Sequence, residues 1–174
     1  MPMETMEPTC ESVQPLLDAE AIPSKGVLPS RFCILRFRDE HLAVELSQVR
    51  EICKLASITS VPGMPRALIG VANLRGNIVP VVDLYPSLGL PGMAALHYAV
   101  VVRQGARHIG IVVEEVPEIQ TAEFEDLVEM PSGEGTCPCP FLSGGLKTAG
   151  QTIGVMDVSR LLVMLEGGID RQAA

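Results

Sequence analysis

Apolar and polar residues alternate along several short stretches of this chain, which is the pattern of half-buried β-strands. Within residues 31–46, one strand face carries Cys33, Leu35 and Phe37, and the alternation resumes after the polar sequence RDEH. This pattern predicts a β-hairpin. The following sequence REICKL, residues 50–55, interleaves charged and apolar residues and predicts a further strand that is exposed on one side.

Three further pairs of apolar runs are separated by turn residues, and each pair predicts another hairpin. These pairs are residues 71–74 with 77–84, 97–104 with 108–116, and 141–150 with 151–158. In the first pair, Gly76 permits the positive φ of a tight reversal. Pro80 removes one backbone donor and predicts that its strand lies at a sheet edge or a bulge. Before this pair, Pro65 predicts a single helical turn that Gly70 ends.

The end of the chain has the period of an amphipathic helix. Its apolar face carries Leu161, Leu162 and Leu165. Asp157 or Ser159 can cap the start of this helix, and Gly167 is expected to end it. Short strands at close spacing, with only brief helical elements, indicate small β-barrels or a β-sandwich. A doubly wound α/β domain fits poorly, because the pattern lacks strands that alternate with long helices.

Composition and charge narrow the range of partners. Of the 174 residues, 47% are hydrophobic and only 3% are aromatic, so the core must consist mainly of aliphatic side chains. The net charge is −8, and residues 114–134 contain eight acidic residues, with no Lys or Arg between Arg107 and Lys147. This charge disfavours nucleic acid as a partner. The acidic segment is either a solvated edge or a docking surface that steers a partner by charge.

The chain divides into a leader, one domain and a short tail. Residues 1–28 lack periodicity and predict a flexible acidic leader, the ordered domain is expected over residues 29–166, and residues 167–174 form the tail. The leader has neither the basic start nor the apolar centre of a secretory signal. No apolar run in the sequence is long enough to cross a bilayer. We therefore expect a soluble, cytoplasmic protein without direct membrane insertion.

The residues that usually carry catalysis do not form a recognisable set. The three histidines stand apart, Asp83 is expected to cap a turn, and the sequence lacks nucleophile-elbow, Walker and dinucleotide-binding motifs. We therefore expect neither an enzyme nor a bound cofactor. Cys33 and Cys53 are expected to be small buried hydrophobes. Cys137 and Cys139 lack the partners of a zinc site and are either structural or part of a redox- or metal-responsive regulatory module.

Recognition therefore remains as the function of the chain. An arginine on a tight turn among apolar residues, as Arg75 is here, can pair with a carboxylate inside the protein or on a partner. Glu51, on the predicted strand 50–55, is the internal candidate. The residues alone leave both readings open, a brace within the fold and a contact with a partner.

Three blocks of the sequence resemble CheW-like domains, the coupling proteins of bacterial chemotaxis-type arrays. They begin at Arg31 (RFCILRFRDEHLAVELSQVREI), at Ser57 (SITSVPGMPRALIGVANLRGNIVPVVDLYPSLGL) and at Phe141 (FLSGGLKTAG, then IGVMDV). The resemblance implies a mainly β fold of two small intertwined β-barrel subdomains with a hydrophobic groove between them, short helical turns and a C-terminal helix. It also implies a non-enzymatic adaptor that links the cytoplasmic tips of methyl-accepting receptors to the regulatory domain of a CheA-type histidine kinase.

The resemblance further implies that Val49, Glu51, Ile52 and Arg75 lie at the receptor-binding region, with Gly70 and Asn73 beside them. We add the apolar strand residues Leu74 and Ile78, which gives a receptor-binding set of eight residues. We expect the apolar members of this set to supply most of the binding energy, the charged pair to set the geometry, and Gly70 and Asn73 to shape the backbone. The chain departs from the family pattern at Cys53–Leu55 and at Tyr85, where an arginine often stands. A signalling system for surface sensing or pilus motility is therefore an alternative to flagellar chemotaxis.

Overall fold

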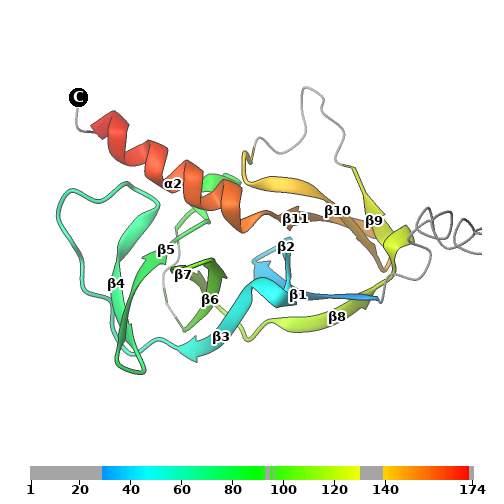
Figure 1. The fold of residues 1–174 in the computed structure, drawn as a ribbon, viewed down its shortest axis with the longest axis horizontal. Helices are drawn as coiled ribbons and strands as arrows, with labels where there is room; N and C mark the ends of the chain where they lie inside the picture. Colours follow the sequence, from blue (N-terminus) through cyan, green and yellow to red (C-terminus); the bar gives the residue numbers. More distant parts are fainter. Residues whose placement is uncertain (1–28, 93–94, 96, 130–138, 173–174) are drawn as a thin grey trace, which may run out of the picture.

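The computed structural model describes residues 29–92, 95, 97–129 and 139–172, and the side chains among them up to residue 167. The strands form two separate sheets, and one long helix begins where the two sheets meet and runs toward the upper left of the view in Figure 1. The expected flexible leader, residues 1–28, lies outside the described residues.

The first sheet has six strands in the order β8-β1-β2-β11-β10-β9. Its members are β1 (Ser30–Phe37), β2 (Glu40–Glu45), β8 (Glu118–Ala122), β9 (Leu127–Val128), β10 (Leu142–Thr148) and β11 (Gln151–Met156). Neighbouring strands are antiparallel except β2 and β11, which pair in parallel. The hairpins predicted within residues 31–46 and 141–158 are both confirmed in this sheet.

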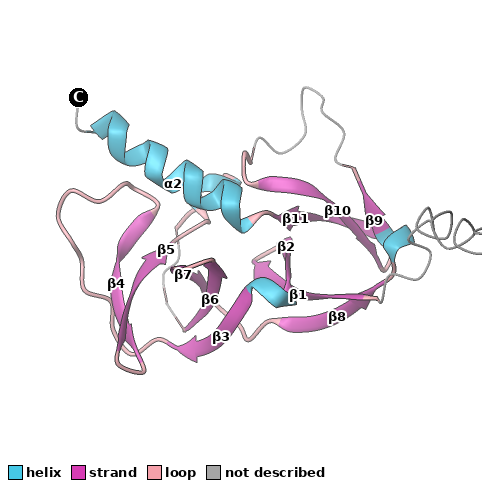
Figure 2. Cartoon of the chain, viewed as in Figure 1, coloured by secondary structure: helices cyan, strands magenta, loops and turns pink. Residues whose placement is uncertain are grey.

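The second sheet has five strands in the order β3-β6-β7-β5-β4, and in sequence all of them lie between β2 and β8. Its members are β3 (Val49–Lys54), β4 (Leu68–Leu74), β5 (Asn77–Val82), β6 (Tyr98–Gln104) and β7 (Arg107–Val113). Each sheet curls into a half-barrel (Figure 2). The predicted mainly β fold of two intertwined barrel-like subdomains is therefore confirmed.

The two half-barrels share one apolar core. The longest helix, α2 (Val158–Gln172), buries Leu161 and Leu165 in a cluster that also contains Leu35 from β1 and Val102 from β6. Because this cluster draws residues from both sheets, it joins the half-barrels into one packed unit. A smaller cluster lies within each half-barrel. Elsewhere in the described residues, the helical elements are the short turns η3 (Leu46–Gln48), η4 (Pro86–Leu88) and η5 (Phe124–Asp126).

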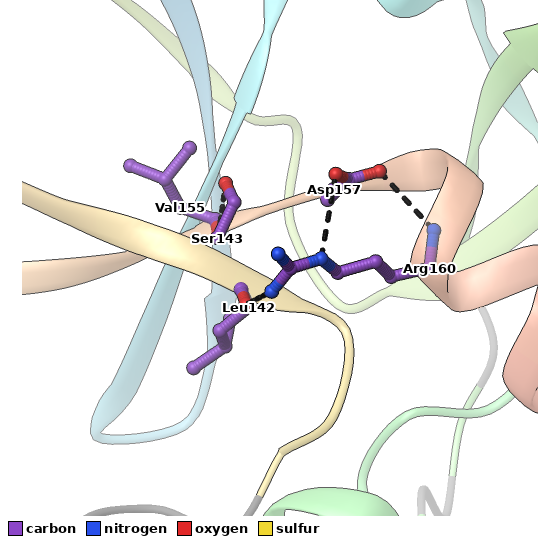
Figure 3. A network of polar contacts seen from close by, with 5 residues as sticks. All are labelled: Leu142, Ser143, Val155, Asp157 and Arg160. Carbon is purple, nitrogen blue, oxygen red and sulfur yellow. Dashed lines mark hydrogen bonds and ion pairs between the residues drawn. The ribbon is translucent and has the colours of Figure 1, made fainter. Parts of the chain in front are cut away.

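Polar contacts fix the start of α2 to the first sheet (Figure 3). The Asp157 carboxylate accepts a hydrogen bond from the Arg160 backbone N–H at 3.1 Å, so Asp157 is the cap among the two predicted candidates. The Arg160 guanidinium donates to the Leu142 carbonyl at 2.8 Å and lies 3.7 Å from the Asp157 carboxylate. Beside this contact, the Ser143 hydroxyl donates to the Val155 carbonyl at 3.3 Å. The bond from Arg160 to the Leu142 carbonyl joins the helix to β10.

The predicted end of the helix at Gly167 is wrong, because α2 continues to Gln172. A glycine ends a helix when it takes the left-handed conformation just after the last turn. Gly167 instead lies within the helix, and nothing approaches the position that its Cβ would occupy. The boundary expected between domain and tail therefore does not coincide with a structural boundary.

The helical turn predicted at Pro65 and the edge position predicted for Pro80 are also wrong. The segment that begins at Pro65 is a tight turn closed by a hydrogen bond from Leu68 N–H to the Pro65 carbonyl at 2.9 Å, and β4 begins at Leu68. Gly70 thus lies inside a strand instead of ending a helical turn. Pro80 is not on an edge strand, since β5 lies between β7 and β4. The alternative, a bulge, is met only on the partner strand: the ladder of β4 with β5 shifts register between Leu68 and Gly70, which pair with Val82 and Val81 beside Pro80. The parallel pairing of β5 with β7 begins at Val81, so the sheet tolerates the missing donor of Pro80.

Candidate docking surface

The turn between β4 and β5 holds Arg75 in an uncommon conformation. Arg75 and Gly76 have φ angles of +52° and +87°, and the Asn73 side-chain oxygen accepts a hydrogen bond from Gly76 N–H at 2.8 Å. Two successive positive φ angles define the type I′ turn that suits a twisted hairpin. Glycine adopts this conformation freely, whereas an arginine there costs roughly 1 kcal/mol. The turn would form more easily with another residue at position 75, so the arginine side chain needs a separate explanation.

The Arg75 side chain reaches the opposite edge of the same sheet. Its Nε atom lies 3.6 Å from the Glu51 carboxylate on β3. In the strand order, β3 and β4 are the two edges of the five-stranded sheet, so this ion pair helps to close the half-barrel. The predicted internal partner of Arg75 is therefore confirmed. Arg75 remains 78% exposed and Glu51 only 20% exposed, so the guanidinium is still accessible to another molecule.

Gly70 allows the backbone at Thr59 to pack closely against β4. The Thr59 and Val71 backbones exchange two hydrogen bonds, at 2.8 and 2.9 Å. This contact brings the Thr59 carbonyl oxygen to 2.3 Å from the position that a Cβ on Gly70 would occupy, and the φ angle of Gly70 is +152°. A side chain at this position would therefore clash with backbone. Gly70 contributes to the predicted site by allowing this close approach.

The four apolar residues of the predicted set lie in different environments. Ile78 is 66% exposed, directly across the ladder from Asn73. Val49 and Ile52 are half-buried against the core that the two half-barrels share. Leu74 is only 4% exposed and packs inside the second half-barrel, so it supports the hairpin from within and offers no contact surface.

Arg50 also belongs to this surface, although the sequence analysis did not single it out. Val49 pairs with Val102 and Glu51 with Val101, so Arg50 is the extra residue of a β-bulge in β3. A bulge re-aims side chains that strict alternation would place on opposite faces. Arg50 accordingly lies 4.0 Å from the Glu51 carboxylate, and its guanidinium lies 3.2 Å from Nε2 of His108 on β7.

The buried thiols are in environments that suppress their reactivity. Burial raises the pKa of the Cys33 thiol to about 11. Burial and then the neighbouring Glu51 raise the pKa of Cys53, with Arg75 acting weakly in the opposite direction. Cys139 is buried and its thiol lies 3.4 Å from the Ser87 carbonyl, while Cys137 lies outside the described residues. Thiolates are the reactive form, so the Cys33 and Cys53 thiols are poor nucleophiles near neutral pH.

Within the described parts of the chain, no group of three or more His, Cys, Asp or Glu side chains could hold a metal ion. A cavity of about 560 Å³ lies in the first half-barrel, beside Phe32, Phe124 and Met156, and none of the eight predicted site residues lines it. Among the same described residues, no helix is both long and apolar enough to span a membrane.

Part of the acidic segment is neutralised within the protein. Arg36 on β1 lies 3.1 Å from the Glu115 carboxylate and 3.7 Å from that of Glu118. All three side chains are at least 48% exposed, so solvent screens these contacts. The segment continues through β8 and η5, where Phe124 is 70% exposed.

Fold and surface together define a binding protein: two half-barrels on a shared core, with an exposed arginine and isoleucine on the hairpin of the second. Residues 31–166 match the CheW-like domain family, and the chain belongs to this family. Chemotaxis protein CheW of Rhizobium meliloti is 29% identical over 125 residues, covering 71% of this chain and 81% of the relative. Protein FrzA of Myxococcus xanthus is 27% identical over 150 residues, covering 84% and 90%. The crystal structure of scaffolding protein TtCheW from Thermoanaerobacter tengcongensis superposes with a TM-score of 0.67 at 26% identity, covering 75% of this chain and 90% of that one.

Proposed function

We propose that this protein is a non-enzymatic cytoplasmic adaptor of a chemotaxis-type signalling array. It couples the cytoplasmic tips of methyl-accepting receptors to the regulatory domain of a CheA-type histidine kinase. The family membership over residues 31–166 carries this proposal, and the similar proteins named for chemotaxis and scaffolding support it. The redox- or metal-responsive alternative based on Cys137 and Cys139 has no support from these relatives and is not pursued.

The adaptor domain proposed here covers residues 29–166, with residues 1–28 as a leader. The family match ends at Glu166, within α2. The part of α2 up to this residue belongs to the packed unit, because Leu161 and Leu165 are buried in the shared core.

The receptor is proposed to dock on the exposed part of the site described above. Arg75 and Ile78 present the largest accessible area, and Val49, Glu51 and Ile52 form the adjoining strand. Asn73 closes the turn, Gly70 admits the neighbouring loop and Leu74 anchors the hairpin from inside. A transient interface of this kind needs to bury only about 1,000 Å².

The test is a binding assay with purified full-length protein, a CheA-type kinase and a receptor cytoplasmic fragment. We expect a ternary complex with the wild type. Arg75→Ala should weaken receptor binding by roughly 1–3 kcal/mol and leave kinase binding unchanged. Arg31→Ala is the matched control, because Arg31 is an exposed arginine on β1 of the other half-barrel.

Three other outcomes are informative. Kinase binding without receptor binding by the wild type would recast the protein as a diverged array component. Binding to neither would mean that the fold has been kept for another function. A loss of cooperative unfolding in Arg75→Ala would show that Arg75 acts mainly as a structural brace.

A further inference from the structure

Arginine side chains gather around His108 at one end of the second half-barrel. Arg103 on β6 pairs across the ladder with His108 on β7, so the two side chains lie on the same face of the sheet. The contact between the guanidinium of Arg50 and Nε2 of His108 links this pair to β3. Arg50 in turn adjoins Glu51, which also contacts Arg75.

We call the four residues Arg50, Arg75, Arg103 and His108 the basic cluster. Glu51 is the carboxylate within reach of both Arg50 and Arg75, at 4.0 and 3.6 Å. Two guanidinium groups thus share one half-buried carboxylate. The nearby Arg107 forms an ion pair with Glu166 on α2 and is neutralised separately. The cluster is therefore positive although the whole chain has a net charge of −8.

The geometry of Arg50 favours a carboxylate partner. A guanidinium only donates hydrogen bonds, so the contact at 3.2 Å requires Nε2 of His108 to act as the acceptor. This contact restrains a side chain that is still 42% exposed. A guanidinium held in one orientation with free N–H groups can bind a carboxylate bidentately and loses less conformational entropy in doing so.

We propose that the docking surface extends from Arg75 along β3 to Arg50 and Arg103, and that it selects a protein segment that presents carboxylates to this basic cluster. The proposal rests on the proposed function and specifies the chemistry of the receptor surface that docks there. Charge complementarity supports a protein partner of this kind, because the strongly negative remainder of the chain repels an extended polyanion.

Charge reversal separates this proposal from a purely apolar interface. We expect Arg50→Glu and Arg103→Glu each to weaken binding of the receptor fragment at least tenfold at low salt, while kinase binding stays within twofold of the wild type. Arg31→Glu makes the same charge change on the other half-barrel and should change receptor binding less than twofold. Wild-type affinity should fall as salt rises, and Arg50→Gln, which keeps a long polar side chain, should reduce this salt dependence.

A charge swap identifies the partner groups. Each acidic residue at the receptor tip is replaced by Lys, and one such variant should bind Arg50→Glu at least tenfold better than the wild-type receptor does. Receptor binding by Arg50→Glu that equals that of Arg31→Glu would overturn this inference and leave the adaptor function standing. A wild type that binds no receptor would overturn both. Binding of a labelled DNA duplex that Arg50→Glu abolishes would assign the cluster to nucleic acid and also overturn the proposal.

Discussion

Replacing Arg75 by Asn separates its contribution to the fold from its contribution to docking. Asn tolerates the left-handed conformation, and Asn-Gly is the preferred dipeptide of a type I′ turn. Relief of the positive φ of +52° should therefore contribute about 1 kcal/mol of stability. The lost ion pair with Glu51 costs about the same or less, because the guanidinium is 78% exposed and such pairs contribute roughly 0–1 kcal/mol.

These two terms nearly cancel, so we expect the free energy of unfolding of Arg75→Asn to stay within about 1 kcal/mol of the wild type. Urea denaturation followed by far-UV circular dichroism is the suitable assay, since the chain has no Trp and only two Tyr. Receptor binding should fall at least tenfold in the same variant. A loss of stability above about 2 kcal/mol would refute the reasoning, because it would give the ion pair a larger structural role than its exposure allows.

Three further perturbations test the rest of the structure. Gly70→Ala should destabilise the fold by more than 2 kcal/mol in urea denaturation, because its Cβ would lie 2.3 Å from the Thr59 carbonyl. Gly105→Ala is the control: its φ of +60° is strained for alanine but nothing lies within 4 Å of the Cβ, so the free energy of unfolding should fall by only about 1 kcal/mol. Burial, followed by the nearby Glu114, raises the pKa of Tyr85 from 10.0 to about 12. The free energy of unfolding should therefore be unaffected by this group below pH 10 and fall by roughly 2 kcal/mol as the pH rises toward 12. In Tyr85→Phe, the free energy of unfolding should change less over this pH range. Asp157→Ala removes the cap of α2 and should lower stability by about 1 kcal/mol, with Asp157→Asn retaining most of it.

The local elements were predictable because their signals are local. Alternation with period two located the strands, and the turn residues located the hairpin from β4 to β5. The sequence offered Glu51 as the internal candidate for Arg75 and left a contact with a partner equally open; the ion pair at 3.6 Å confirms the internal candidate. Asp157, which caps α2, was one of two predicted caps; the other, Ser159, lies two positions further along the chain.

The features that the sequence did not predict depend on distant contacts. Strict alternation places Arg50 and Glu51 on opposite faces of β3, and only the bulge against β6 brings both side chains together. The contact of Arg50 with His108 joins residues 58 positions apart. Position 70 of β4 needs a glycine because the Thr59 backbone approaches it, which no feature near Gly70 in the sequence reveals. The inner strand β5 tolerates Pro80 because its parallel pairing with β7 begins only at Val81.

In the hairpin from β4 to β5, some residues stabilise the fold and others are exposed and available for binding. Leu74 and Val79 are buried in the second half-barrel and stabilise it through apolar burial. Ile78 remains 66% exposed, so it gains little from folding, and Arg75 combines a strained backbone with an ion pair that water screens. Neither residue is explained by the stability of the isolated protein. Both side chains would contribute binding energy when the surface of a partner covers them. The proposed receptor contact is therefore assigned to the outside of this hairpin, and the residues that support it to the inside.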